Sequence, residues 1–184
     1  MADAIAMWHA EHVDYSRLLD VLEEQVAAFH AGRDPNYSLM LDVVSYLRHF
    51  PDRFHHPRED AAFARLVELD PRLQLPINRL LQEHRVIAAA GEELLKRLNE
   101  VVDGASIARE TLEAAAAVFL VYYRYHMATE EMEVLPRAAK MLTRDDWRIV
   151  ASAVSSAPDP LFGDGVEERY RELRKQIAIK AGTA

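Results

Sequence analysis

Apolar residues recur every three or four positions along most of the chain, a spacing that places them on one face of an α-helix. Over the first 31 residues this face comprises Ile5, Trp8, His12, Tyr15, Leu19, Leu22, Val26 and Phe29. Gly32 follows, and glycine commonly ends a helix. The pattern therefore predicts a helix from Ala2 to about Ala31, with Trp8 and His12 at core positions.

A second helix is expected to begin at Asp34-Pro35, because aspartate caps helices and proline suits the first helical turn. Pro51 and Pro57 interrupt it, and each proline removes a helical hydrogen bond and can kink the helix. The apolar face on either side of these prolines comprises Met40, Val44, Leu47, Ala62, Leu66 and Leu69.

Two more long helices are predicted. The third begins at Asp70-Pro71, and the fourth follows a turn at Asp103-Gly104, with Ser106 as its cap. The face of the third comprises Ile77, Leu80, His84, Ile87, Gly91, Leu94, Leu98 and Val101. The face of the fourth comprises Leu112, Ala115, Phe119, Tyr122, His126, Glu130 and Glu133. Pro136 is expected to end or bend the fourth helix.

The pattern beyond residue 142 predicts shorter elements. Thr143 and Asp146 resemble a capping box, which predicts a helix to about Ser155. Residues 158–165 are typical of a linker, and a final amphipathic helix is expected over residues 166–179.

These elements together predict an all-α fold. Four long helices with short connections imply antiparallel neighbours, so we expect an antiparallel up-down four-helix bundle over residues 1–142. Residues 143–184 are expected to form a C-terminal helical extension packed on the bundle. The scarcity of glycine, with six residues, and the abundance of strong helix formers agree with this class.

Composition limits the chemistry. The net charge of −8 argues against a nucleic-acid contact surface. The absence of cysteine excludes disulfides, thiolate catalysis and iron–sulfur ligation by this chain, so a metal must bind through histidine and carboxylate. No signal peptide is recognised, and the apolar run over residues 114–123 is shorter than the roughly 20 residues that span a bilayer. We expect a cytoplasmic protein.

Two of the long helices carry histidine followed by glutamate four residues later, as His55–Glu59 and His126–Glu130. Residues four apart lie on one helix face, so both side chains of a pair can reach one metal centre. The other two helices each place one histidine, His12 or His84, within an apolar face. All four helices thus contribute to a set of six candidate metal ligands, His12, His55, Glu59, His84, His126 and Glu130.

Energetics favour a metal at these six residues. A buried imidazole or carboxylate without partners costs on the order of several kcal/mol. Six such groups in one core would threaten a fold whose total stability is roughly 5–15 kcal/mol. A metal cluster satisfies all six groups at once. A single buried histidine is more often a hydrogen-bonded core residue, and it is the combination that points to metal.

The order His12, His55-x-x-x-Glu59, His84, His126-x-x-x-Glu130 resembles the hemerythrin-like HHE cation-binding family, as do the stretches FPDRFHHPREDAAF and YHMATEEMEVLP. The resemblance covers about residues 3–140. It implies a non-haem di-iron centre with an oxo or hydroxo bridge, in which the two glutamates bridge the irons and the histidines complete their coordination. The residues after about 142 lie outside the family pattern.

The sequence departs from the oxygen-carrying members of that family, which have a second histidine four residues from the first on the third helix. The corresponding positions here are Leu80 and Ala88. Four histidines, two bridging glutamates and one bridging oxygen leave two of twelve positions open on two six-coordinate irons. The set resembles the di-iron repair proteins of the family, but this chain lacks their cysteine-containing N-terminal segment.

The remaining histidines and two tyrosines are interpreted separately. His56 lies about 100° from His55 on a regular helix, which favours a supporting or surface role over that of an added metal ligand. His9, His30 and His49 lack matching partners and are expected not to be ligands. Tyr15 and Tyr122 are expected to be core residues; the alternative is a phenol hydrogen-bonded to a metal-bound oxygen species.

Several functions stay open. Within the family, the candidates are binding or sensing of oxygen, nitric oxide or peroxide, redox chemistry on such molecules, and iron handling or repair, so the sequence does not decide whether the chain is an enzyme. A separate protein partner is possible for signalling, and the oligomeric state is undetermined. A ferritin-type site is disfavoured because no Glu-x-x-His pair ends at a candidate ligand. A metal-free helical interaction module must explain six inward polar groups.

Overall fold

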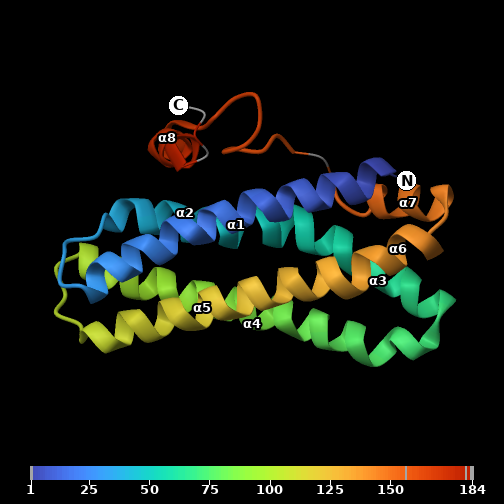
Figure 1. Cartoon of the computed structure of the whole chain (residues 1–184), viewed down its shortest axis with the longest axis horizontal. Coiled ribbons are helices and arrows are strands. Elements are labelled where there is room, and N and C mark those ends of the chain that lie inside the picture. The colour runs from blue at the N-terminus through green and yellow to red at the C-terminus, as the bar shows by residue number, and fades with distance from the viewer. Residues whose placement is uncertain (1, 156, 181, 183–184) are drawn as a thin grey trace.

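The structure is a computed structural model that describes residues 2–155, 157–180 and 182. Within these residues it is all-helical, without strands, which confirms the predicted class (Figure 1). The helices of the bundle are α1 (Ala2–His30), α2 (Tyr37–Phe50), α3 (His56–Leu69), α4 (Gln74–Val102), α5 (Arg109–Thr129) and the short α6 (Leu135–Met141), which continues α5. A π-helical segment, Pro51–His55, joins α2 to α3, and a second, Glu130–Val134, joins α5 to α6.

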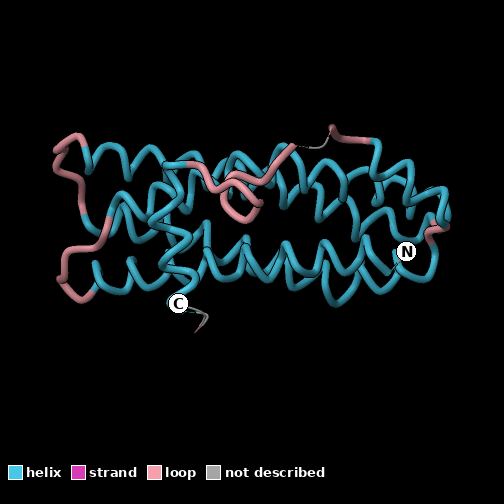
Figure 2. Tube along the Cα trace, turned by 90° about the horizontal axis from the view of Figure 1, so that it is seen from above, coloured by secondary structure: helices cyan, strands magenta, loops and turns pink. Residues whose placement is uncertain are grey.

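The long helices lie side by side as a helical bundle (Figures 1 and 2). Helix α4 packs against α5 and α2, and α1 packs against α2 and α5. The shorter α7 (Arg144–Ser152) packs against α3, whereas α8 (Arg171–Lys180) crosses α1 and α2 on the outside of the bundle. The division of the chain at residue 142 stays a prediction.

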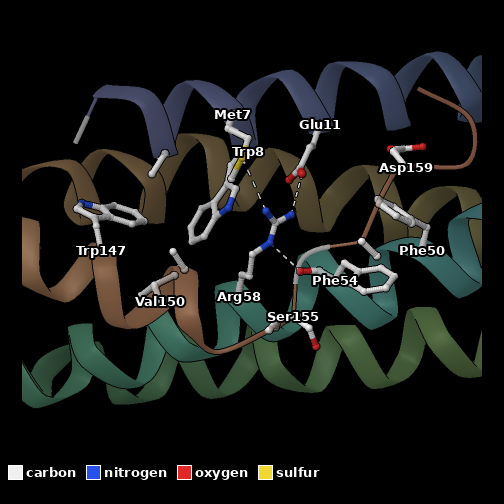
Figure 3. A pocket seen from close by; sticks show the side chains of 14 residues that line it. Met7, Trp8, Glu11, Phe50, Phe54, Arg58, Trp147, Val150, Ser155 and Asp159 are labelled. Atoms are coloured by element: carbon white, nitrogen blue, oxygen red, sulfur yellow. Dashed lines mark hydrogen bonds and ion pairs between the residues drawn. The ribbon is translucent and has the colours of Figure 1, made fainter. Parts of the chain in front are cut away.

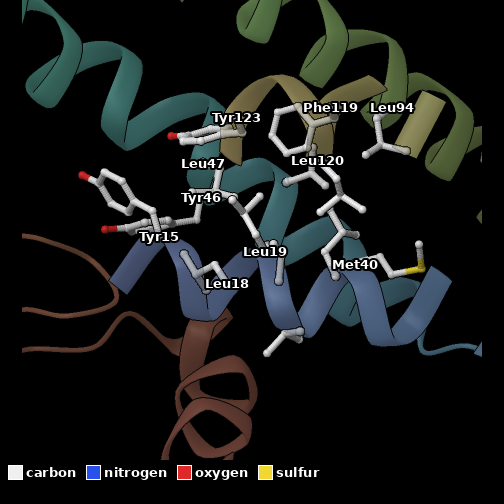
Figure 4. Close-up of a cluster of buried hydrophobic side chains, with 14 of the residues drawn as sticks. Tyr15, Leu18, Leu19, Met40, Tyr46, Leu47, Leu94, Phe119, Leu120 and Tyr123 are labelled. Atoms are coloured by element: carbon white, nitrogen blue, oxygen red, sulfur yellow. The ribbon is translucent and has the colours of Figure 1, made fainter. Parts of the chain in front are cut away.

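Two clusters of buried apolar side chains fill the bundle. One includes Leu19, Met40, Leu47, Leu94 and Phe119 (Figure 4). The other, toward α7, includes Trp8, Phe63, Leu66, Ile77, Leu80 and Trp147. Burial of each large apolar side chain contributes about 1.5–3 kcal/mol, so the clusters provide a stable frame on both sides of the segment between them. Along the chain, five of the six candidate ligands fall between residues of the two clusters, and His126 lies beside Met127 at the edge of the first cluster.

Helix starts differ from the sequence prediction by a few residues. The side chain of Asn36, not Asp34, caps α2 by accepting from the Leu39 amide at 3.0 Å. Asp70 caps a short 3₁₀ turn, Pro71–Leu73, before α4 begins. Helix α5 begins at Arg109 rather than directly after Ser106. The capping box of Thr143 and Asp146 is confirmed.

The buried face of the fourth long helix was assigned incorrectly at several positions. Tyr122 is 41% exposed, whereas its neighbour Tyr123 is fully buried. Buried positions on a helix recur at intervals of three or four residues. Either interval is compatible with the sequence here, so the pattern alone did not distinguish Tyr122 from Tyr123 as the buried residue. Beyond Glu130 the π-helical segment adds a residue to the turn, which buries Val134 and leaves Glu133 exposed.

Among the described residues, none of the helices is both long and apolar enough to cross a membrane.

Candidate metal centre

Two π-helical segments shape the helices that carry the His-x-x-x-Glu pairs. The amide of His56 bonds to the Pro51 carbonyl, and the amide of Leu135 bonds to the Glu130 carbonyl, each five residues back. A proline follows directly in both cases, Pro57 and Pro136. Proline lacks an amide hydrogen and clashes with the carbonyl four residues earlier, which disfavours a regular α-turn. Such π turns frequently occur at functional sites, and here they adjoin both motifs.

The structure brings His12, His55 and Glu59 together on one side of the bundle interior. Nε2 of His55 lies 2.9 Å from Oε1 of Glu59 and 3.0 Å from Nε2 of His12. Nε2 of His12 is 3.4 Å from Oε1 of Glu59 and 3.5 Å from Oε2 of Glu130. All four residues are buried. Ligand atoms of His12, His55 and Glu59 lie within 4.8 Å of one another, close enough for one ion.

The other oxygens of the same two carboxylates face a second group of histidines. Nε2 of His84 lies 3.5 Å from Oε2 of Glu59 and 3.8 Å from Oε1 of Glu130. Nε2 of His126 lies 3.1 Å from Oε1 of Glu130. A ligand atom of His56 joins those of Glu59, His84 and His126 within the same 4.8 Å limit. Each glutamate therefore stands between two groups of imidazoles.

His56 is the largest difference from the sequence prediction. It is 5% exposed, which excludes the surface alternative, whereas the expected supporting role stays a prediction. Its ring stacks on that of His84 with centroids 4.3 Å apart and an interplanar angle of 18°. Its Nδ1 lies 2.9 Å from Asp52, one helical turn earlier. Regular α-helical geometry would turn it away from His55, but the π-helical segment ends between these residues and allows both rings to face the interior.

Carboxylates that the sequence analysis missed hold the outer nitrogens of the other four imidazoles. Nδ1 of His55 lies 2.6 Å from Glu11 and Nδ1 of His84 lies 2.9 Å from Asp60. Nδ1 of His126 lies 3.2 Å from Glu83, and Nδ1 of His12 lies 2.8 Å from Glu131. A carboxylate on Nδ1 fixes the ring and leaves Nε2 for a metal, as in many metalloproteins.

These four contacts form a closed ring around the bundle. Glu11 of α1 contacts the imidazole of His55 just before α3, and Asp60 of α3 contacts that of His84 on α4. Glu83 of α4 contacts the imidazole of His126 on α5, and Glu131 after α5 contacts that of His12 on α1. Each of these carboxylates is the immediate chain neighbour of a candidate ligand on its own helix. That adjacency is the sequence signal by which they can be recognised.

His56 differs electrostatically from the other four imidazoles of the site, whose pKa values are all raised by nearby carboxylates. Burial lowers the pKa of His12, but hydrogen bonds to Glu131 and Glu59 outweigh this effect and raise the pKa to about 10. Burial and the nearby His84 hold the pKa of His56 well below its ordinary value. A metal that binds His12 must therefore displace a proton, whereas the His56 imidazole is already in the neutral form that metals require.

Buried polar atoms without partners provide the test of whether these residues fit a metal. Both oxygens of Glu59, both oxygens of Glu130, and Nε2 of His84 and His126 are buried without a well-formed hydrogen bond among the described residues. Leaving such an atom without a partner costs about 1–3 kcal/mol of folding free energy, and more when the group is charged. Histidine nitrogen and carboxylate oxygen are the ligands of non-haem iron and of zinc. The donor set fits a metal cluster.

Two phenol groups adjoin the candidate ligands. The Tyr15 ring lies 5.2 Å from the His55 ring, and the Tyr123 ring lies 6.2 Å from the His56 ring. Both hydroxyls are buried and have no hydrogen-bond partner among the described residues. Figure 4 shows them directed toward the same end of the apolar cluster. The phenol that the sequence analysis placed at Tyr122 thus belongs to Tyr123.

The histidines expected not to be ligands lie elsewhere. His9 is exposed and contacts Glu131 at 3.1 Å, on the outer side of the carboxylate that holds His12. His30 contacts Glu113, and Nδ1 of His49 lies 2.6 Å from the Ser45 carbonyl within α2.

A cavity of about 410 Å³ lies beside the site, between α1, α3 and the segment around α7 (Figure 3). Its wall is largely apolar and includes Trp8, Phe54 and Trp147. Glu11 and Arg58 line it and pair at 2.7 Å, and Glu11 is the carboxylate that also holds His55. The cavity therefore contacts the candidate centre through Glu11.

Comparison with known proteins identifies one family. The model of the hemerythrin HHE cation-binding domain matches residues 3–138, most of the chain. Neither the comparison with curated proteins nor the comparison with solved structures gives a match.

Proposed function

The chain belongs to the hemerythrin HHE cation-binding domain family, and from this premise we propose that it holds two iron ions within the bundle. We further propose that an open coordination position binds, senses or reacts with a small molecule of the class of oxygen, nitric oxide or peroxide. Bound iron supplies redox chemistry and a position that such a ligand can occupy.

The division of the carboxylate oxygens is the observation that carries the two-ion proposal. Oε1 of Glu59 lies 2.9 Å from His55, whereas its Oε2 lies 3.5 Å from His84. Oε2 of Glu130 lies 3.5 Å from His12, whereas its Oε1 lies 3.1 Å from His126. A single ion would leave one buried oxygen of each glutamate without a partner. Two ions use all four oxygens.

The residue roles follow from this division. His12 and His55 would hold one ion, His84 and His126 the other, and Glu59 and Glu130 would bridge them. An antiparallel up-down arrangement of the four long helical runs belongs to the same proposal, because it lets all four contribute ligands at one level. The packing of α1 on α2 and α5, and of α4 on the same two helices, supports it.

The surroundings of the site suit a small ligand. The site lies between two apolar clusters, which exclude water and strengthen electrostatic interactions. The hydroxyls of Tyr15 and Tyr123, which have no partner in the part of the chain that the structure describes, can each donate a hydrogen bond to a ligand that enters from their side. A metal-free interaction module would bury the same glutamate and phenol groups without any interaction to offset the cost of their desolvation. It is therefore the weaker alternative.

The proposal is tested by anaerobic reconstitution with ferrous iron, followed by metal analysis and optical spectra. Two irons per chain are expected, with separate spectral changes when oxygen, nitric oxide or peroxide is added. Binding of one iron or none per folded chain would contradict the two-ion proposal. Two bound irons without any spectral response to the three ligands would contradict the small-molecule proposal and leave iron handling as the function.

A further inference from the structure

We propose that His56 supplies a fifth imidazole to the ion held by His84 and His126. This inference rests on the proposed function and specifies how the coordination is completed. It assigns to the first residue of α3 the ligand that α4 lacks, since Leu80 and Ala88 occupy the positions one turn from His84.

Proximity is the first argument. A ligand atom of His56 lies within 4.8 Å of ligand atoms of Glu59, His84 and His126, the same limit that groups His12 and His55 with Glu59. The stacked rings of His56 and His84 come from the neighbouring helices α3 and α4, and the His56 ring centroid is 6.0 Å from that of His126. Three imidazoles thus converge beside the same carboxylate.

The outer side of the ring provides the second argument. Nδ1 of His56 faces Asp52 at 2.9 Å, so Nε2 is the nitrogen left for a metal. The other four imidazoles of the site each have a carboxylate hydrogen-bonded at Nδ1, whereas Oδ1 of Asp52 lies close to His56 without the geometry of a hydrogen bond. A carboxylate beside Nδ1 is the arrangement that ligating histidines commonly have, and a small movement of Asp52 would complete the hydrogen bond.

Asp52 is itself held in place. It forms an ion pair with Arg48, whose side chain crosses α4 at Gly91. A Cβ atom at Gly91 would lie 2.7 Å from Cγ of Arg48 and 2.9 Å from Phe119, too close for an ordinary contact. The absence of a side chain at Gly91 gives Arg48 its path to Asp52, which lies beside His56.

A fifth imidazole makes the two ions unequal. If the two glutamates and one oxygen bridge the ions, His56, His84 and His126 would complete six positions on one ion. His12 and His55 would leave one position open on the other. That open position would lie on the side of His55, whose ring is 5.2 Å from Tyr15. A small ligand should bind to the ion held by His12 and His55.

A crystal structure of the zinc-loaded, unaltered protein tests the assignment without any mutation. We expect Nε2 of His56 about 2.0–2.1 Å from the ion that His84 and His126 also bind, the usual zinc–imidazole distance. A structure in which both ions are bound but His56 stays more than about 3 Å from them would overturn the inference, because no bond exists at that separation.

Rescue by free imidazole provides a second test in solution. His56→Ala should weaken binding of one of the two ferrous ions by about tenfold or more, and millimolar imidazole should restore it by entering the vacated space. His49→Ala, a histidine change in the adjoining α2, is the matched control and should bind both ions unchanged. Circular dichroism checks that each variant is folded. A folded His56→Ala variant with unchanged metal affinity would refute a ligand role, as would weakened binding that imidazole does not restore.

The outcomes separate this inference from the proposed function. If the unaltered protein binds no iron or a single iron, the proposed di-iron function fails. If it binds two ions and His56 contacts neither, only the fifth-imidazole inference fails.

Discussion

Glu131 follows Glu130 in the chain, yet it contacts the imidazole of His12 on α1, with Oε1 2.8 Å from Nδ1. Neighbouring glutamates thus face different partners, one toward the interior of the site and one toward the outer nitrogen of a histidine. The same division of labour recurs at Glu59 and Asp60. In both cases a carboxylate on one helix contacts a histidine on another, a relationship that the sequence alone does not reveal.

Removal of a bridging carboxylate should release metal. Glu130→Ala deletes the two oxygens that face His12 and His126, so we expect loss of most of the bound iron. Because metal binding contributes to folding free energy, the melting temperature measured with iron should also fall. Glu133→Ala, an exposed glutamate three residues later, is the control and should keep both irons. Full iron content in folded Glu130→Ala would show that Glu130 is not a bridge.

Removal of an outer carboxylate should weaken metal binding without abolishing it. Glu11→Gln keeps the shape of the side chain but removes the charge that holds His55 and pairs with Arg58. Changes at such positions commonly reduce metal affinity by about 10–100-fold. Competition with a chelator measures the effect. Glu23→Gln, on the exposed face of the same helix, should leave the affinity unchanged, and equal affinities for both variants would contradict the supporting role of Glu11.

The phenols should behave differently from an ordinary buried tyrosine. The Tyr15 hydroxyl lacks a partner among the described residues, so Tyr15→Phe should leave the free energy of unfolding of the metal-free protein unchanged or slightly higher. Tyr46 donates to Asp159 at 2.8 Å, so Tyr46→Phe should cost about 1 kcal/mol. Urea unfolding compares them.

The ligand-binding role of Tyr15 requires a second measurement. In the ferric protein, Tyr15→Phe should weaken binding of azide, a small anion that reports on the open position, by removing a hydrogen-bond donor. Tyr46→Phe should not change azide affinity. Identical azide titrations for Tyr15→Phe and the unaltered protein would remove the phenol from the proposed site.

Acid should loosen the contact between α7 and α3. Hydrogen bonds from the hydroxyl and amide of Thr143, with the guanidinium of Arg65, lower the pKa of Asp146 to about 2 from the ordinary 3.8. A depressed pKa means that the ionised carboxylate stabilises the folded state above about pH 4, and this contribution is lost as the pH falls from about 4 to about 2. Trp147 fluorescence should follow the loss. Asp146→Asn should remove the pH dependence in this window, and a persistent transition in that variant would assign it to another group.

The sequence predicted the helical class and the meeting of six site residues because both depend on local spacing. Apolar residues at helical intervals define a buried face, and a histidine within that face is carried into the interior, as His12 and His84 are. The assignment of these residues as ligands stays a proposal. The iron content of the protein will test it.

Other features escaped the sequence analysis for identifiable reasons. The position of His56 depends on the π-helical segment, and regular helix geometry does not anticipate the extra residue in its turn. The choice between Tyr122 and Tyr123 depends on how α5 is rotated against its neighbours, which spacing leaves undetermined. The outer carboxylates depend on contacts between different helices, as between Glu83 and His126, and no pattern within one helix reports them.

The ring of carboxylates means that no half of the bundle contains a complete half-site. A fragment ending after α3 keeps His55 and its Glu11, but His12 loses Glu131 and Asp60 loses His84. The complementary fragment loses the support of His84 in turn. Two such fragments, expressed separately, should each bind iron poorly and regain it only on reassociation. The visible absorbance of the iron centre would then report whether the two fragments have reassembled into the complete bundle.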